Sequence, residues 1–466
     1  MRTIHRIGIG FLVGLFFAGG YAARTMSMHR ELAAAGLVRQ GPVRAPGIPV
    51  ASARLEGGAN IDLRPLETML MVLKHLREHY VEQLSPADEG KMTHDSIRAM
   101  LASLNDPNTR FLDPAQRKLL SDAREGRFHG IGAILGIKRI TEGKITDEHL
   151  IVIAPIEGGP ADKAGLKPGD DIVEIDGKSV LPFDPYQKAS EMLKDEWAKR
   201  TKDQSQVRKD IEAEKKRIDN GIGILDAEKM LTSDSDDEKE RTVEITVVRK
   251  GLAKPAKIKV TRESFSAEPL TSSVLEGGVG YVRINCISRT TGDRLAAALD
   301  ELRGTQVKGL VLDLRNLAGG DVNTAVEVAK PFLAGKILGT EVRSRGRRTR
   351  IDVPATAGVH KWNAPVVVLV NRGTARMSEV LAASLRENSG AKLVGEKTYG
   401  DFSATTVIDQ RDGSALALTT GVFVTSKGGN YNGKGLPVDV EVASTQTGDP
   451  QLKEAARLAA SGESRS

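Results

Sequence analysis

The pattern of hydrophobic and polar positions distinguishes an apolar run at the start of the 466-residue chain from the rest of the sequence. Ile7 to Ala23 carries no charge, with two arginines before it and Arg24 after it. Secretion machinery reads a positive start before an apolar run, and about 25 Å of helix is near the lower limit for crossing a bilayer. We predict a signal peptide or signal anchor at residues 1–24 and a Pro- and Gly-containing linker at 25–60. The protein is then exported to the periplasmic or extracellular side, either free or anchored in the membrane.

The next segment has helical periodicity. From Leu66 to Tyr80, apolar side chains recur every three or four residues, which predicts an amphipathic helix. Further helices are expected at Ser96–Leu104 and Pro114–Arg124. Residues 61–127 are therefore interpreted as an N-terminal helical region.

From residue 128 the pattern changes to short apolar strands and turns. A short helix at Ala161–Ala164 ends at a glycine, Pro168-Gly169 makes a turn, and Asp176-Gly177 makes a tight turn after a strand. This order resembles a PDZ domain. The resemblance implies that peptide C-termini add a strand to it, although some PDZ folds serve only as lids. It also implies a cradle of backbone N–H groups for the terminal carboxylate, formed by Gly130, Ile131, Gly132 and Ala133.

A charged insertion interrupts the PDZ pattern at about 185–240. Between Lys188 and Asp219, 18 of 32 residues are charged, with a narrow apolar stripe at helical spacing. The segment is expected to be helical, either as a solvated surface or as a docking helix for a partner. Strands at Thr242–Arg249 and Ala256–Thr261 complete a PDZ domain spanning 128–265.

The third region alternates apolar strands with helices. Strands are predicted at Val279–Ile284, Gly309–Arg315 and Pro365–Asn371, with helices between them. This alternation indicates a buried, mostly parallel sheet in an α/β core at 266–446, before a C-terminal helix and tail at 447–466. Sites on such sheets lie at the carboxyl ends of strands, which singles out two loops, Asn316–Gly320 and Asn371–Ser378. The whole chain is thus α/β and multidomain.

The composition argues against several classes of function. With 40% hydrophobic and 27% charged residues the chain can bury a core, and its net charge of +6 with 4% aromatics does not favour nucleic-acid binding. The single cysteine, Cys286, excludes an intramolecular disulfide and fits a buried structural thiol. His75 and His79 stand four apart but among charged residues, so we expect neither a metal site nor a cofactor.

Several motifs in the core resemble those of the C-terminal processing (tail-specific) serine peptidase family. The resemblance extends over about residues 65–460 and includes the PDZ pattern. The motifs are Leu312-Asp313-Leu314-Arg315-Asn316, Val368-Leu369-Val370-Asn371-Arg372-Gly373, Val394-Gly395-Glu396-Lys397-Thr398-Tyr399-Gly400, Gly435-Leu436-Pro437-Val438-Asp439 and Asp449-Pro450-Gln451-Leu452.

The resemblance implies a Ser–Lys dyad, in which a neutral lysine accepts the proton of a serine nucleophile while backbone N–H groups hold the oxyanion. This chain departs from that pattern at every catalytic position. Arg376 stands at the nucleophile position, Asp401 at the lysine position and Thr405 at that of an orienting glutamine. The glycine pair of the oxyanion loop, Gly319 and Gly320, is retained.

Arginine stays protonated and is neither a nucleophile nor a base. We therefore predict that Arg376 and Asp401 form an ion pair in place of the dyad. Ser378 and Lys397 are the fallback for a shifted dyad, but both are expected to be structural, with Ser378 placed to cap the following helix.

Three functions remain open from the sequence. The first is a catalytically deficient family member that binds protein tails through its PDZ domain. The second is an active serine endopeptidase that cleaves C-terminal tails through Ser378 and Lys397. The third is a partner subunit that assembles with an active paralogue or as a homo-oligomer, through the helical region or the charged insertion.

Overall fold

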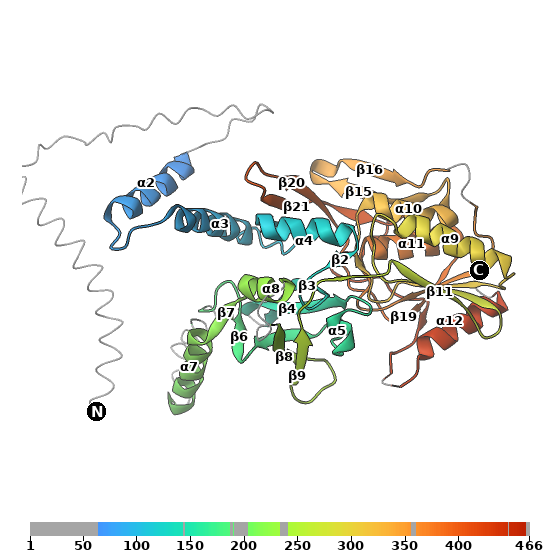
Figure 1. The fold of residues 1–466 in the computed structure, drawn as a ribbon, viewed down its shortest axis with the longest axis horizontal. Helices are drawn as coiled ribbons and strands as arrows, with labels where there is room; N and C mark the ends of the chain where they lie inside the picture. Colours follow the sequence, from blue (N-terminus) through green and yellow to red (C-terminus); the bar gives the residue numbers. More distant parts are fainter. Residues whose placement is uncertain are drawn as a thin grey trace, which may run out of the picture. The chain divides into compact units, whose positions relative to one another are not determined.

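The computed structural model describes residues 64–142, 145–186, 190, 204–233, 241–355, 360–445 and 447–462 (Figure 1). The predicted signal segment at 1–24 and linker at 25–60 lie outside these ranges. The chain divides into two compact units, Met1–Glu89 and Gly90–Ser466. Within the described residues, no helix has the length and apolar character needed to cross a membrane.

The predicted helices before the PDZ domain are present, with one boundary corrected. They are α2 (Arg64–His79), α3 (Pro86–Ala102) and α4 (Pro114–Arg124). The helix α3 begins ten residues earlier than predicted, because Ser85 and Asp88 exchange capping hydrogen bonds at its start (Ser85 N to Asp88 Oδ2 2.9 Å, Asp88 N to Ser85 Oγ 3.2 Å). Its first turns carry few apolar residues, so periodicity did not reveal them.

Within its described residues, the predicted PDZ region forms a seven-stranded sheet packed with two short helices, α5 and α8. The sheet order is β3-β4-β5-β6-β7, with β8 paired to β5 and β9 paired to β8. Its elements are β3 (Ala133–Glu142), β4 (Ile145–Pro155), α5 (Pro160–Lys163), β5 (Asp171–Ile175), β6 (Lys178–Leu181), β7 (Gly221–Gly223), α8 (Ile224–Thr232), β8 (Thr242–Val248) and β9 (Ala256–Thr261).

The charged insertion is shorter than predicted. Its described helix, α7 (Gln204–Asp219), confirms the helical expectation, while much of Lys188–Asp219 lies outside the described residues. The prediction that the insertion runs to about 240 is wrong, because β7 joins the PDZ sheet and α8 buries Ile224, Ala227 and Leu231 in the PDZ core.

The α/β core contains the predicted mostly parallel sheet. Its order is β11-β12-β13-β17-β19-β22, with β11 antiparallel to β12 and every other neighbouring pair parallel. The strands are β11 (Leu270–Leu275), β12 (Val279–Ile284), β13 (Leu310–Asp313), β17 (Val366–Val370), β19 (Lys392–Gly395) and β22 (Val440–Glu441).

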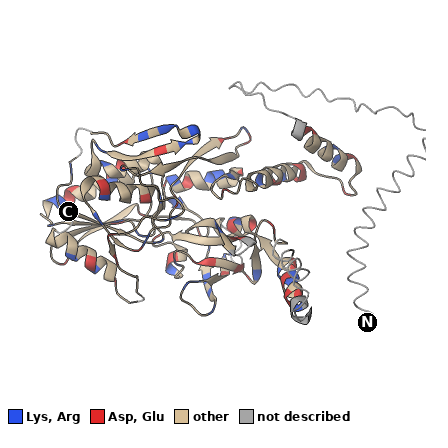
Figure 2. Cartoon of the chain, turned by 180° about the vertical axis from the view of Figure 1, so that it is seen from behind, with Lys and Arg blue, Asp and Glu red and all other residues tan. Residues whose placement is uncertain are grey.

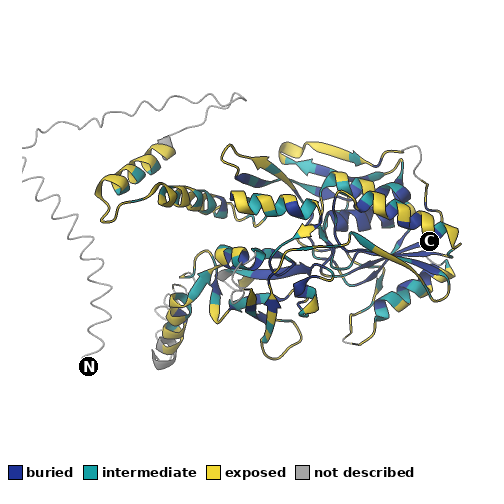
Figure 3. Ribbon diagram, viewed as in Figure 1, coloured by how far each residue is buried: buried dark blue, intermediate teal, exposed yellow. Residues whose placement is uncertain are grey.

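Helices cover both faces of this sheet because successive side chains of a strand point to opposite faces. Val367 and Leu369 of β17 pack with the C-terminal helix α12 (Pro450–Ser461). Val368 and Val370 pack on the other side, with α9 (Thr291–Gly304), α10 (Val322–Leu333) and α11 (Met377–Ser389). Every residue of β13 and β17 is therefore buried, as is most of α11, which is dark blue in Figure 3.

A second sheet, which the sequence did not predict, packs against α10 and α11 from the side away from the parallel sheet. Its strands are β1 (Arg110–Leu112), β15 (Ile337–Arg343), β16 (Arg348–Asp352), β20 (Ser403–Asp409) and β21 (Ala415–Val424). The strand β1 pairs with β21, so the region expected to be only helical contributes a strand to the core. Basic side chains line the β15–β16 hairpin, of which β16 is largely exposed (Figure 2).

Candidate functional site

The candidate site forms where two parallel strands end and their loops turn into helices. The strand β13 leads into the Asn316–Gly320 loop, and β17 leads into a turn and the short strand β18 (Ala375–Arg376) before α11. The other short strand, β14 (Ala318–Gly319), pairs in parallel with β18, which sets Gly319 opposite Arg376. The two loops singled out in the sequence therefore meet at the carboxyl edge of the sheet.

Two asparagines join these loops. The side chain of Asn371 donates to Asn316 Oδ1 (2.8 Å) and accepts from the backbone N–H groups of Asn316 (3.0 Å) and Gly373 (2.9 Å). Thr374 adds a buried hydrogen bond from its hydroxyl to the carbonyl of Leu314 (2.8 Å). This network satisfies the polar groups that both strands leave unpaired at their ends and holds the loops in register.

The backbone of Arg376 has an unusual conformation. Its φ of 61° and ψ of −130° lie in a region that favours glycine, at a cost of about 1–3 kcal/mol for other residues. Its N–H donates to Glu379 Oε2 (3.2 Å), which satisfies one donor at the start of α11. A strained turn between a strand and a helix is where some hydrolases hold their nucleophile. In this chain the residue on such a turn is Arg376, so the turn carries a guanidinium group.

Glu379 is the buried hub beneath this turn. Besides Arg376, it accepts hydrogen bonds from the backbone N–H groups of Gly400 (2.8 Å) and Asp401 (2.9 Å) and from the Thr398 hydroxyl. Burial raises the pKa of Glu379 to about 7, although these hydrogen bonds act in the opposite direction. The carboxyl group thus ties the segment that carries Asp401 to the start of α11.

The predicted ion pair between Arg376 and Asp401 is present. Arg376 Nε lies 3.1 Å from Asp401 Oδ2 and donates a hydrogen bond to it. The two partners differ in exposure, because the Asp401 side chain is 7% exposed and that of Arg376 is 35% exposed. The carboxylate is therefore inside the protein, while part of the guanidinium faces solvent.

Two residues of this site were not found from the sequence. Asn108 Nδ2 donates to Asp401 Oδ1 (3.3 Å) and to Ser403 Oγ (2.9 Å), and Ser403 gives Asp401 both its hydroxyl and its backbone N–H (3.1 Å). Asp401 is thus surrounded by donors, as a buried carboxylate requires. The sequence marks Asn108 only as part of a turn, and its distance along the chain from Asp401 leaves no local pattern to detect.

The other predicted site residues lie apart from this pair. Thr405 is exposed on β20. Ser378 is fully buried, and its hydroxyl has no hydrogen-bond partner in the described part of the chain. Lys397 is exposed. The expectation that Ser378 caps the helix is wrong, because α11 begins at Met377 and Glu379 satisfies the N–H of Arg376 there.

The glycine pair of the neighbouring loop has the backbone freedom that its conformation requires. Gly319 and Gly320 have φ values of 120° and 82°, in the left-handed region. A Cβ at Gly320 would lie 2.8 Å from Ile287 Cδ1, so a side chain would also clash. The N–H of Gly320 has no hydrogen-bond partner within the described ranges.

In the PDZ domain, the predicted carboxylate cradle lies at the start of β3. Gly130 and Gly132 have φ values of 72° and 66°, and Gly130 approaches α8 so closely that a Cβ would lie 2.2 Å from the carbonyl oxygen of Leu231. The buried Ile131 donates its N–H to that same oxygen (2.8 Å). One of the predicted cradle donors is therefore already used inside the domain, and Ala133 begins the strand.

Two other candidate features belong to neither of the two core loops. His75, Glu78 and His79 form a group on α2 with ligand atoms within 4.8 Å of one another, and all three are exposed. Cys286 is buried as predicted, and burial raises the pKa of its thiol to about 11, so at neutral pH it is an unreactive thiol.

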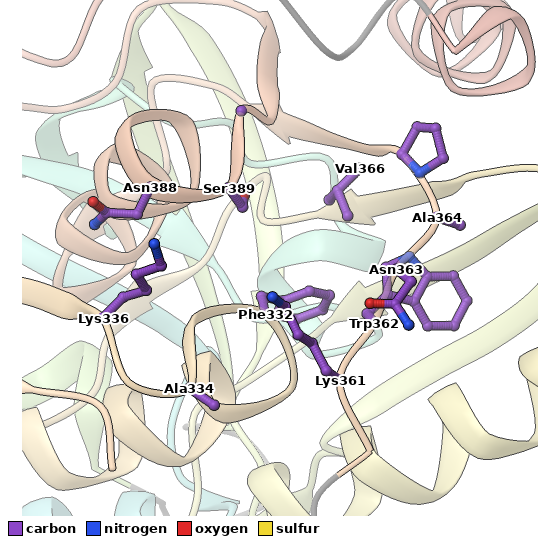
Figure 4. Close-up of a pocket in the computed structure, with 12 residues that line it drawn as sticks. Phe332, Ala334, Lys336, Lys361, Trp362, Asn363, Ala364, Val366, Asn388 and Ser389 are labelled. Carbon is purple, nitrogen blue, oxygen red and sulfur yellow. The ribbon is translucent and has the colours of Figure 1, made fainter. Parts of the chain in front are cut away.

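A cavity of about 290 Å³ also lies elsewhere (Figure 4). Its lining includes Phe332, Lys336, Trp362, Val366 and Asn388. Val366 is the first residue of β17, whereas the Arg376 turn follows the last residue of that strand. The cavity is thus at the opposite end of the sheet and takes no part in the site.

Comparison with known proteins identifies the class of protein. The family model for peptidase family S41 matches residues 278–442, and a PDZ domain model matches 151–196. The chloroplastic C-terminal processing peptidase of Tetradesmus obliquus is 33% identical over 368 residues, which cover 79% of this chain and 71% of that one. The chain therefore belongs to peptidase family S41, among the C-terminal processing peptidases.

Further relatives agree with this assignment. The carboxy-terminal processing protease CtpA of Bacillus subtilis is 28% identical, over 76% of this chain and 64% of its own length. Among solved structures, a photosystem II D1 C-terminal processing protease matches with a TM-score of 0.56 and 27% identity, covering 85% of this chain and 92% of that one.

Proposed function

We propose that this chain is a non-proteolytic member of peptidase family S41 that binds peptide tails through its PDZ domain. The observation that carries the proposal is the ion pair of Arg376 and Asp401 on the strained turn before α11. A guanidinium remains protonated and has no lone pair available for attack on a carbonyl. Asp401 accepts hydrogen bonds from Asn108, Arg376 and Ser403, so its carboxylate is engaged in the ion pair and the network around it.

The burial of Ser378 and the exposure of Lys397 argue against the shifted dyad. A general base must lie within hydrogen-bond reach of the proton that it removes. The Ser378 hydroxyl has no hydrogen-bond partner among the described residues, so no lysine amine contacts it. An active endopeptidase that uses this pair would need both side chains to move.

The edge strand β3 supports peptide binding by the PDZ domain. Within the described sheet, β3 pairs with β4 and with no other strand. Its second edge therefore offers backbone N–H and C=O groups to an extended peptide, the binding mode of PDZ domains. The predicted cradle at Gly130–Ala133 lies at the end of that edge.

A second proposal is that the chain acts as a partner subunit of an active peptidase or of another copy of itself. It rests on large hydrophobic side chains that are exposed in α2, namely Leu66, Leu70, Met71 and Val72. Co-purification of a tagged chain from native membranes, followed by mass spectrometry, tests this role. Recovery of the chain alone as a monomer would contradict it.

We also propose that residues 1–24 export the protein. The support is the charge and hydropathy pattern of that segment. An alkaline phosphatase fusion after residue 60 should be active in bacterial cells, because that reporter folds only outside the cytoplasm. Activity that persists when residues 1–24 are deleted would contradict export by this segment.

The test of the main proposal is an assay of proteolysis. Purified protein is incubated with unfolded casein, alongside a Ser378→Ala variant, and products are followed by gel and mass spectrometry. We expect no cleavage by either protein. Cleavage by the parent that disappears in Ser378→Ala would establish the shifted dyad and overturn the proposal.

A further inference from the structure

We propose that Arg376 makes the former nucleophile position a receptor for the C-terminal carboxylate of a bound peptide. This inference rests on the proposed function, because it requires a site that holds a chain end without cleaving it. The ligand is an extended peptide with a free C-terminus, and the contact is a charge-assisted hydrogen bond to the guanidinium.

The first support is the number of donors that Arg376 leaves unused. A guanidinium has five N–H groups, and Arg376 commits only Nε–H, to Asp401. Within the described ranges, neither Nη atom of Arg376 has an acceptor. Because the Arg376 side chain is 35% exposed, an incoming anion can reach its two Nη groups.

The second support comes from another arginine of the same chain. Arg315 binds Asp313 through Nε and Nη2 and binds a second carboxylate, Asp449, through Nη1 and Nη2. One guanidinium thus accommodates two carboxylates on adjacent edges. In Arg376 only Nε bonds to Asp401, and within the described residues the Nη1/Nη2 edge has no acceptor. Asp401 therefore does not exclude a second carboxylate.

The third support is the neighbouring glycine loop. Gly319 is the strand partner of Arg376, and the next residue, Gly320, has an N–H without a partner in the described part of the chain. Ile287 lies where a side chain at this position would be, so the loop requires glycine here. Gly320 directly follows β14, so its amide is a further hydrogen-bond donor beside the strand pair that carries Arg376.

The position of the PDZ domain favours a peptide as the ligand. Gly136 of β3 lies against the core segment next to Asp401, since a Cβ at Gly136 would lie 3.8 Å from the Tyr399 hydroxyl. Glu157 of the PDZ domain also pairs with Arg283 of the core. The PDZ domain and the core are thus in contact beside β3, and the proposal has the peptide run from the edge of β3 to the core loops. Because Ile131 N–H is already bonded in the PDZ loop, Arg376 is the stronger carboxylate receptor.

The test uses the full chain and a fluorescein-labelled alanine-rich decapeptide without acidic residues, as free acid and as C-terminal amide. A photoreactive benzoylphenylalanine stands three residues from the C-terminus. Anisotropy measures affinity, and mass spectrometry locates the cross-links. We expect the free acid to bind at least ~10-fold tighter than the amide, as for a charge-assisted bond of about 1.4 kcal/mol or more. Cross-links should fall within 316–320 and 371–376.

The variant Arg376→Met/Asp401→Asn removes both charges and leaves no buried carboxylate unpaired. It should abolish the preference for the free acid, and Arg376→Lys should retain part of it. Arg372→Met is the matched control, because Arg372 is an exposed arginine of the same loop that pairs with Glu396 (3.4 Å). That control should keep the full preference.

Three results would overturn the inference. They are an unchanged preference in the double variant, binding of neither peptide, and cross-links confined to the PDZ loop at 130–133. The last result would leave the proposed function intact, because the PDZ domain would hold the terminus alone. The proposed function fails on different results, namely cleavage of the decapeptide or of casein, or binding of neither peptide, whereas an unchanged preference in the double variant overturns the inference alone.

Discussion

Two arginines near the carboxyl edge of the parallel sheet, Arg315 and Arg376, each pair with a buried aspartate but have different surroundings. Arg315 is 11% exposed and uses Nε, Nη1 and Nη2 to bind Asp313, Asp449 and Gln451, joining β13 to the start of α12. Arg376 is 35% exposed and has a strained backbone, and among the described residues its side chain makes one hydrogen bond, to Asp401.

The difference separates structural from functional use of the same ion pair. A buried pair with every donor engaged holds two elements together, and its loss leaves charges without partners. A pair whose arginine is partly exposed and lies on a strained turn adds less stability. It also leaves guanidinium N–H groups that can bind a ligand. Arg315 should therefore affect folding most, and Arg376 should affect binding most.

The largest expected effect is on the Arg315 network. Arg315→Ala leaves the fully buried Asp313 without its cation and should lower the free energy of unfolding by about 3–5 kcal/mol. Urea denaturation measures the change. Arg294→Ala is the control, since Arg294 and Glu268 form an exposed pair, and it should change stability by less than about 1 kcal/mol. If Arg315→Ala and Arg294→Ala lowered the free energy of unfolding equally, the buried Arg315 network would add no more stability than an exposed pair.

The next effect depends on pH and concerns Glu379. Its folded-state pKa of about 7 lies above the value of 4.5 expected in the unfolded chain. The folded state therefore binds the proton more tightly, and stability from this group, full below about pH 4.5, is lost as pH rises towards 7. The loss is ~1.4 kcal/mol per pH unit at most.

The matched variant for that effect is Glu379→Gln, which cannot titrate. Urea unfolding at pH 5 and pH 7.5 should show a fall in the stability of the parent relative to the variant, of roughly 2–3 kcal/mol. Parallel pH profiles of the two proteins would show that Glu379 is ionised throughout and would contradict the raised pKa.

A smaller loss is expected at Arg376. Arg376→Met should cost about 2 kcal/mol, less than Arg315→Ala, because Asp401 keeps hydrogen bonds from Asn108 and Ser403. Adding Asp401→Asn should restore about 1 kcal/mol by removing the unpaired charge. If the two changes prove additive, the ion pair makes no net coupling and the comparison with Arg315 weakens.

The smallest expected effect is a difference in stability between substitutions of two buried serines of α11, Ser378 and Ser384. Ser378→Ala removes a hydroxyl without a hydrogen-bond partner in the described part of the chain and should leave stability unchanged or raise it by up to about 1 kcal/mol. Ser384→Ala removes a hydroxyl that donates to the carbonyl of Ile337 (2.9 Å) and should cost about 1 kcal/mol. A larger loss from Ser378→Ala would indicate a partner for its hydroxyl.

The central pair could be predicted from the sequence because its two residues occupy defined motif positions, 25 residues apart. The mostly parallel sheet followed from its continuous apolar strands, such as Val366–Val370, which is buried throughout. The pair follows from the resemblance to the peptidase family, and the sheet follows from a pattern that is local in the chain.

The features that were missed depend on contacts between distant segments. Asn108 reaches Asp401 across 293 positions, and β1 pairs with β21 from a region with helical periodicity. The strand β20 has an irregular burial pattern with a bulge between Ala404 and Thr405, so alternation did not reveal it. These elements are fixed by tertiary packing, which leaves no periodic pattern of apolar residues in the local sequence.

The most direct test of the absence of catalysis is to restore the family's residues. The triple variant Arg376→Ser/Asp401→Lys/Thr405→Gln is compared with the parent chain for cleavage of unfolded casein, at equal folded concentration. The account predicts no cleavage by the parent and measurable cleavage by the triple variant, because the strained turn, the glycine loop and the sheet edge are already in place. Cleavage by the parent at a rate equal to or above that of the variant would contradict the account.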